Sequence, residues 1–344
     1  REMLSNGKAS RYKTGPYGDG KGLDHFVNAA GGIDIIIGGP PCQAYSVAGR
    51  VRDENGMKDD YRNYLFEHYL SVVNRYQPKV FVFENVPGLL SAMSDGTPII
   101  QLIESGFSSI GYEIVDDVKK YAKVDASDYG VPQNRERLII LGIRKDLCED
   151  VQVILHRFYL EILPKYKSKK KKTVAEAIGD LPKITPIIND EELKSRIGYS
   201  KPECHTTWHR ARHHSLRDVE IYRMLANDIQ SGRNEYVDSK SLSDLYEEKV
   251  GAKSPIHRYH VLRADEPSTT IISHLDRDGN RFIHYDPEQG RDITPREAAR
   301  IQSFDDDFDF IGNQTDTYIM IGNAVPPLLA KCVGLAVSEV LDIL

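Results

Sequence analysis

The feature that most constrains the fold is a regular alternation of strand-like and helix-like segments in the first half of the chain. The predicted strands are residues 33–37, 79–83, 113–118 and 138–143, and the predicted helices between the first three are residues 61–75 and 99–110. Short apolar runs indicate buried strands, whereas apolar residues at helical spacing indicate helices that pack on a sheet. Strands that alternate with helices form βαβ units. We therefore predict an α/β fold with a doubly wound, mostly parallel sheet.

The middle of the chain lacks this regularity. Residues 165–173 form a lysine run, which is typical of an exposed loop. The histidine-rich residues 204–214 contain only one cysteine, so we favour a helix whose His and Arg side chains face solvent or phosphate over a zinc site. Helical patterns return at residues 294–304 and 324–341.

These changes of pattern divide the chain into three parts. We expect residues 1–145 and 256–344 to form one α/β domain, closed by the C-terminal helix, and residues 146–255 to form an irregular insertion. Residues 151–260 hold 20 Lys/Arg and 15 Asp/Glu, whereas the rest of the chain holds 25 and 36. A basic segment in a chain of net charge −6 is compatible with a polyanionic partner, and equally with a solvated surface.

Composition narrows the class of protein further. A chain of 344 residues can bury a sizeable core and form about two domains. Its four cysteines include no Cys-x-x-Cys pair, which argues against a disulfide framework and a structural zinc site. We therefore expect reduced thiols and a cytosolic setting. The sequence contains no continuous apolar run of membrane-spanning length, so we expect no transmembrane segment.

Chemically reactive side chains flank three of the predicted strands. Cys42 follows the first strand after a Gly-Gly-Pro-Pro break, Glu84 follows the second, and Arg135 and Arg137 lead into the last. If the first two strands are parallel neighbours, Cys42 and Glu84 converge at one sheet edge, where α/β folds bind ligands. Nearby arginines lower the pKa of a thiol, and apolar surroundings raise the pKa of a carboxyl. The thiol could therefore attack an electrophilic ring, the carboxyl could protonate it, and the guanidinium groups could hold it. Alternatively, Glu84 caps the next turn and the arginines begin an ordinary exposed strand.

Several short motifs occur in a fixed order along the chain. They are Pro-Pro-Cys-Gln at 40–43, Glu-Asn-Val at 84–86, Gln-Asn-Arg-Glu-Arg at 133–137, Arg-Glu-Ala-Ala-Arg-Ile-Gln-Ser-Phe at 296–304 and Gly-Asn-Ala-Val-Pro-Pro at 322–327. With these motifs the chain resembles the DNA (cytosine-5)-methyltransferases of the bacterial modification type. The resemblance covers about residues 33–145 and 255–342. It implies a Rossmann-like fold that uses S-adenosylmethionine, with the insertion as target-recognition domain.

The resemblance also implies a role for each matching residue. Cys42 would attack C6 of a cytosine flipped out of duplex DNA, while Glu84 would bond N3 and the exocyclic amine and supply a proton. Arg137 would hold the O2 side of the base, with Arg135 supporting the same site. C5 would then take the methyl group, and loss of the C5 proton would expel the cysteine. The other implied contacts are to the cofactor (Pro41, Leu65, Asn323 and Ala324) and to DNA (Gln43, Ser46 and Arg50).

The expected protein is therefore a monomeric DNA cytosine-5 methyltransferase of the bacterial cytoplasm. Its implied partners are double-stranded DNA and a cognate restriction endonuclease acting on the same site, with no metal and no membrane. Two alternatives stay open. One is an RNA cytosine-5 methyltransferase of similar fold, and the other is a non-catalytic DNA-binding remnant.

One family feature is missing from the sequence. Members begin with a strand and a Gly-rich turn of the Phe-x-Gly-x-Gly type, whose backbone approaches the cofactor. Residues 1–32 contain no such motif, and the chain begins with Arg1 rather than methionine. We therefore expect a chain that lacks an N-terminal part of the enzyme, in preference to a split enzyme or a circular permutation.

This expectation gives a first prediction. The polypeptide alone should bind S-adenosylmethionine poorly and methylate DNA weakly, because most of the cofactor platform is missing. Transfer of a radiolabelled methyl group to DNA measures this directly. Robust transfer by these 344 residues would contradict the expectation.

Overall fold

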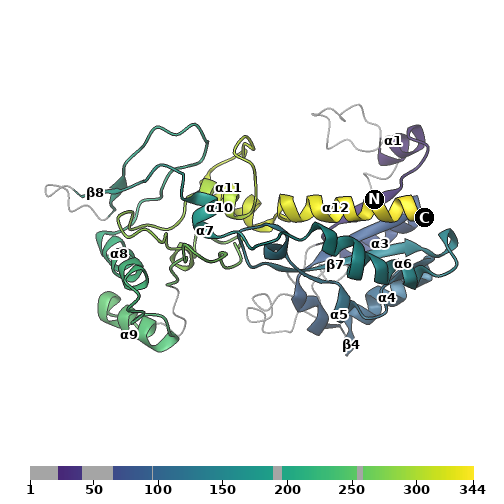
Figure 1. The fold of residues 1–344 in the computed structure, drawn as a ribbon, viewed down its shortest axis with the longest axis horizontal. Helices are drawn as coiled ribbons and strands as arrows, with labels where there is room; N and C mark the ends of the chain where they lie inside the picture. The colour runs from purple at the N-terminus through teal and green to yellow at the C-terminus, as the bar shows by residue number, and fades with distance from the viewer. Residues whose placement is uncertain (1–21, 41–64, 95, 189–195, 254–258) are drawn as a thin grey trace. The chain divides into compact units, whose positions relative to one another are not determined.

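The computed structural model describes residues 22–40, 65–94, 96–188, 196–253 and 259–344. The chain forms two compact units, whose segments can be followed by colour in Figure 1. The first unit consists of Arg1–Val124, Glu136–Tyr166 and Gly334–Leu344, and the second consists of Asp125–Arg135 and Lys167–Val333.

A mixed sheet with the strand order β1-β2-β7-β5 forms the centre of the first unit. Its strands are β1 (Ile35–Gly38), β2 (Val80–Asn85), β5 (Tyr112–Ile114) and β7 (Glu136–Arg144), and β6 (Lys123–Asp125) also pairs with β7. β1 is parallel to β2, whereas β7 is antiparallel to both β2 and β5. Among these four strands, therefore, three run one way and β7 is reversed. The predicted α/β architecture is confirmed.

The first unit also contains helices. They are α1 (Leu23–Ala29), α3 (Leu65–Tyr76), α4 (Ile99–Ser109), α5 (Val118–Tyr121), α6 (Val151–Arg157) and part of α12 (Pro327–Ile343), and a small hairpin joins β3 (Met93–Ser94) to β4 (Thr97–Pro98). Aromatic rings attach α3 and α4 to β2. Phe107 stacks on Phe81 with ring centroids 4.0 Å apart, and Tyr69 meets Phe83 edge-on at 5.4 Å. These rings cover the face of β2 that carries Phe81 and Phe83. Val80 and Val82, which point to the opposite face, are buried as well, so β2 is buried on both faces.

The described elements lie close to their predicted positions, with one clear shortening. The strand predicted at residues 113–118 ends at Ile114, because Asp117 caps α5 instead of continuing the strand. Its carboxylate accepts a hydrogen bond from the Lys120 amide at 2.9 Å. Such a side-chain cap stabilises a helix start by about 1 kcal/mol.

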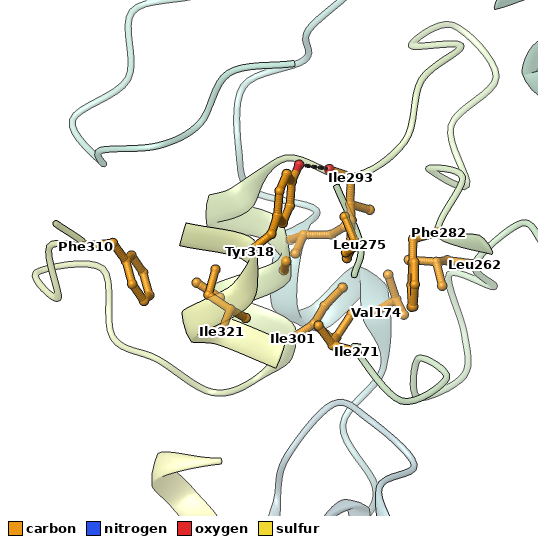
Figure 2. Packing of buried hydrophobic residues seen from close by; sticks show 13 residues of the cluster. Val174, Leu262, Ile271, Leu275, Phe282, Ile293, Ile301, Phe310, Tyr318 and Ile321 are labelled. Atoms are coloured by element: carbon orange, nitrogen blue, oxygen red, sulfur yellow. Dashed lines mark hydrogen bonds between the residues drawn. The ribbon is translucent and has the colours of Figure 1, made fainter. Parts of the chain in front are cut away.

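The second unit has a less regular fold around its own apolar core. Its elements are α7 (Val174–Ile178), β8 (Pro186–Ile187), β9 (Gly198–Tyr199), α8 (Leu216–Gln230), α9 (Ser239–Val250), α10 (Pro295–Ile301), α11 (Gln314–Asn323) and the start of α12. Figure 2 shows part of this core, where Ile301 of α10 and Ile321 of α11 pack with Val174 of α7. The Tyr318 hydroxyl donates to the Ile293 carbonyl at 2.7 Å and ties α11 to the preceding loop.

The unit boundaries differ from the predicted domains. Residues 146–166, expected in the insertion, belong to the first unit. Tyr159 attaches this segment to the β7 backbone, with hydrogen bonds of 2.9 Å to both Ile139 O and Leu141 N. Residues 256–333, expected in the catalytic domain, belong to the second unit.

The helix predicted at residues 204–214 is wrong, because this segment is a loop. Two of its histidines are buried rather than solvent-facing. His209 lies 2.8 Å from the Pro182 carbonyl and 3.2 Å from the Thr294 hydroxyl. The loop is therefore fixed by contacts with distant segments rather than by its own periodicity.

One segment passes the length and composition test for a membrane span, contrary to the expectation from sequence. It is Gln314–Ile343, which contains an 18-residue window with a mean hydropathy of 1.6. This segment comprises two helices, α11 and α12, and α12 buries Leu329, Val333, Ala336, Val337 and Val340 on one face. A one-sided apolar stripe of this kind is typical of a helix that packs on a protein core.

A buried ionic network stabilises the second unit. Arg291 makes two hydrogen bonds of 2.7 Å to the Glu297 carboxylate, and His284 lies 3.6 Å from the same carboxylate. Burial opposes the charge of Glu297, but Arg291 outweighs it and lowers the pKa of Glu297 to about 2. Burial also lowers the pKa of His284 to about 4, despite the attraction of Glu297. His214, buried in the same unit, has its pKa lowered to about 4 mainly by desolvation.

These histidines predict how stability depends on pH. Between pH 6.5 and 4 the unfolded chain takes up protons at His284 and His214 while the folded chain does not, so the free energy of unfolding should fall by a few kcal/mol. Protonation of Glu297 in the unfolded chain lowers the free energy of unfolding further, but only below pH 4.5. Urea unfolding from pH 7 to 4 measures the effect. His284→Asn should lower the slope of the free energy of unfolding against pH by the equivalent of about one proton. His274→Asn, at an exposed site, should leave this slope unchanged. A flat wild-type profile would contradict the prediction.

Candidate active site

The ends of β1 and β2 form one corner of the candidate site. Their parallel register pairs Gly38 with Phe83, so Gly39 lies beside Glu84. A Cβ atom on Gly39 would be 2.7 Å from Glu84 Oε2, so a side chain at this position would force the Glu84 carboxylate to shift. The predicted neighbouring, parallel arrangement of the two strands is confirmed. Cys42 itself lies outside the described residues, together with Pro41, Gln43, Ser46 and Arg50.

Asn85 connects the two strand ends. Its Nδ2 donates to the Pro40 carbonyl at 3.3 Å, and its Oδ1 accepts from the Val86 amide at 2.9 Å. Asn85 thus holds both the turn after β2 and the chain that leads toward Cys42. The turn-stabilising role considered as an alternative for Glu84 is carried by Asn85, a residue that the sequence analysis did not single out.

Glu84 pairs with Arg137 across the sheet. The antiparallel register of β2 and β7 places Asn85 opposite Leu138, so Arg137 lies at the end of β2. Its Nε is 3.0 Å from Glu84 Oε1, and the two side chains are 12% and 18% exposed. An adjacent guanidinium favours the charged carboxylate, which opposes the effect of desolvation assumed from the sequence. The corner therefore presents a charged pair that is largely shielded from solvent.

Arg135 has a different environment. Its side chain is 2% exposed and belongs to the second unit. Its Nη1 donates to the Ile271 carbonyl at 2.7 Å, and its Nη2 donates to the carbonyls of Gly322 at 2.8 Å and Ala324 at 3.2 Å. A guanidinium bound to backbone carbonyls in this way is a positioning group. We therefore revise the substrate-supporting role predicted for Arg135.

The backbone that Arg135 holds carries two of the predicted cofactor contacts. Asn323 is the last residue of α11, and its side chain is exposed. The side-chain amide of Asn323 has no hydrogen-bond partner among the residues that the structure describes. The Ala324 carbonyl also accepts from Gln302 Nε2 at 2.7 Å. A Cβ atom on Gly322 would lie 2.3 Å from the Ser273 amide nitrogen, so only glycine permits this close crossing. Of the other predicted contacts, Leu65 is the first residue of α3.

Comparison with known proteins identifies the family. The family model described as C-5 cytosine-specific DNA methylase matches residues 9–339. The chain belongs to this family. It is 35% identical over 327 residues to the type II methyltransferase M.Bpa9945I of Bacillus paralicheniformis, a match that covers 90% of this chain and 71% of that protein. It is 33% identical to M1.HphI of Haemophilus parahaemolyticus, covering 89% of this chain and 68% of that protein.

A solved structure supports the fold of this methylase. It is described as a prophage-encoded DNA modification methyltransferase of E. coli, and it matches with a TM-score of 0.54 at 24% identity. The match covers 93% of this chain and 83% of that one. The α/β methyltransferase fold and the DNA cytosine-5 methyltransferase class, with S-adenosylmethionine as methyl donor, are thus confirmed for this chain.

Gly39 gives a prediction for this methylase. Gly39→Ala should displace the Glu84 carboxylate from Arg137, and a misplacement of about 1 Å costs on the order of 100-fold in rate. The assay is tritium release from C5 of cytosine in duplex DNA, which requires attack at C6 but no methyl donor. Gly334→Ala, which adds its methyl group in open space on α12, is the matched control. Unchanged tritium release by a folded Gly39→Ala variant would contradict this account.

Proposed function

We propose that this chain transfers a methyl group from S-adenosylmethionine to C5 of a cytosine flipped out of a specific double-stranded DNA sequence. The reaction proceeds through a covalent bond between the Cys42 sulfur and C6. The observation that carries this proposal is the corner at the sheet edge. There the strand that leads to Cys42 runs beside Glu84, and Glu84 lies 3.0 Å from Arg137.

Each step follows from the chemistry of the ring. The Cys42 thiolate adds to C6, and the electrons of the C5–C6 double bond move toward N3 and O2. Glu84 delivers a proton to N3, and Arg137 holds the O2 side by charge and hydrogen bonding. C5 would then bond to the methyl group, with the sulfonium sulfur of the donor as leaving group, and N3 would return its proton to Glu84. Removal of the C5 proton restores the double bond as the S–C6 bond breaks, so the thiol must be both a nucleophile and a leaving group.

The described residues are compatible with the cofactor. When bound, S-adenosylmethionine supplies the methyl group. The exposed Asn323 amide is available to a ligand, whereas the Ala324 carbonyl is already bonded to Arg135 and Gln302. Asn323 would therefore hold the cofactor by its side chain and Ala324 by apolar contact, with Pro41 and Leu65 as the further contacts. Among the residues that the structure describes, no group of three His, Cys, Asp or Glu could hold a metal ion.

The wider role follows from the relatives. Two of them are named as type II methyltransferases, which supports a role in a restriction-modification system with a cognate endonuclease. We place the enzyme in the bacterial cytoplasm as a monomer. Residues 146–255 would act as target-recognition domain, and Gln43, Ser46 and Arg50 would contact the DNA. The RNA methyltransferase and the non-catalytic remnant are distinguished by the experiment below.

The decisive variants are Cys42→Ser and Glu84→Gln. Cys42→Ser should abolish tritium release from C5 and covalent trapping by DNA containing 5-fluorocytosine. Glu84→Gln keeps the nucleophile but loses the proton donor, so its rate should fall by roughly 100-fold or more. Duplex affinity should stay near that of the wild type in both variants.

Cys148→Ser is the matched control, because burial raises the pKa of the Cys148 thiol and keeps it protonated. It should retain wild-type tritium release. A wild-type chain that binds duplex DNA without tritium release would be a binding remnant. Release from RNA alone would instead identify an RNA enzyme.

A further inference from the structure

The second unit carries a basic cleft. None of the residues with a named role in the proposed reaction lines it. Its volume is about 1070 Å³, and it is lined by the loop around residues 196–215, the start of α8, residues 276–280 and the first residue of α11. The lining contains five arginines and lysines against two aspartates, in a chain whose net charge is −6. His214 adds no charge at neutral pH, because its pKa is about 4. The cleft therefore concentrates positive charge.

Three of these cations pair with no carboxylate in the part of the chain that the structure describes. Arg196, Lys201 and Arg210 are exposed, and none forms an ion pair with any residue that the structure describes. Lys183 of the same unit shows the contrast, since it pairs with Asp286 at 3.0 Å and Glu288 at 2.6 Å. Cations that converge without partners repel one another unless a polyanion lies between them.

The loop that carries Arg210 is held in a strained conformation. Trp208 has a φ of +67°, a left-handed conformation that costs about 1–2 kcal/mol for a residue with a side chain. Its indole Nε1 donates to Asp309 at 3.1 Å, and its carbonyl accepts from the Arg296 amide at 3.2 Å. The Arg210 guanidinium lies 4.7 Å from the indole ring centroid. Strain that is kept by several contacts, next to a charged cleft, is characteristic of a binding loop.

A polar side chain of different type lies in the same cleft. The backbone carbonyl of Asn280 accepts a hydrogen bond from the His260 amide at 2.8 Å. The side-chain Oδ1 of Asn280 accepts a hydrogen bond from the Tyr222 hydroxyl. These contacts fix the orientation of the side chain, and its amide NH₂ has no partner among the described residues. An oriented amide is suited to bond a base edge, whereas arginine and lysine at an open rim are suited to phosphates.

We propose that this cleft binds duplex DNA, with Arg196, Lys201 and Arg210 on backbone phosphates and Asn280 on a base edge. This assignment rests on the proposed function, in which double-stranded DNA is the substrate. It names residues of the second unit that determine affinity and sequence preference.

The test compares salt dependence of DNA binding. The variants Arg196→Gln, Lys201→Gln and Arg210→Gln keep size and polarity but remove one charge each. Binding of a fluorescent random-sequence duplex is measured by anisotropy between 50 and about 300 mM salt. Each variant should weaken binding roughly tenfold at about 0.1 M salt and lower the slope of log K against log salt by about 0.9. The triple variant should lower the slope by nearly three times as much.

Lys183→Gln is the matched control, because it removes one charge from the same unit outside the cleft. It should leave the slope unchanged. Slopes that stay at the wild-type value in all three cleft variants, with unfolding midpoints intact, would overturn the cleft assignment. A wild-type chain that binds folded RNA but no duplex DNA would overturn the proposed function instead.

Asn280→Ala tests the base contact separately. Selection of bound sequences from a randomised duplex pool should show a relaxed preference at one base-pair position, by about 5- to 100-fold, with an unchanged salt slope. An unaltered preference would show that Asn280 does not read the sequence. Equally weaker binding of all sequences would place it on a phosphate rather than a base.

Discussion

The register of β2 between β1 and β7 is the constraint on which the candidate site depends. It places Gly39 beside Glu84 on one side of β2, and Arg137 at the end of β2 on the other. Because side chains alternate between the faces of a sheet, a slip of one residue would turn Glu84 away from Arg137. The buried Phe81 and Phe83 oppose such a slip, since it would also reverse the packing of their rings. Core packing and site geometry are thus set by the same strand pairing.

The segment from Gln133 to Arg137 contributes side chains to both units. Gln133 and Arg135 are buried in the second unit, where Gln133 Oε1 accepts from the Ile271 amide at 2.8 Å and Arg135 binds three carbonyls. Arg137 instead belongs to the first unit and pairs with Glu84. Buried polar groups of this kind are costly to remove, because their partners lose a hydrogen bond that water cannot replace. Arg135 therefore fixes backbone of the second unit, whereas Arg137 lies beside Glu84 in the first unit.

Local patterns explain which features could be predicted. The strands before Cys42 and Glu84 were predictable, because a short apolar run closed by Gly and Pro is specified by neighbouring residues. The loop containing His209 was not, because its partners Thr294 and Pro182 are distant in sequence. Arg135 and Arg137 are the same residue type two positions apart, so only tertiary packing separates their roles. The close approach of Gly39 to a carboxylate likewise could not be predicted, because the adjacent strand supplies that carboxylate.

The Glu84–Arg137 pair changes how proton donation must be understood. A carboxyl in apolar surroundings would hold its proton before substrate arrives, but a guanidinium 3.0 Å away favours the charged carboxylate. A base that draws the guanidinium toward its O2 would weaken this pairing and raise the proton affinity of Glu84. Attack at C6 then increases the basicity of N3 at the same moment. In the proposed mechanism Arg137 would thus link binding of the base to protonation of Glu84, because its positive charge would shift from the Glu84 carboxylate toward O2 of the base.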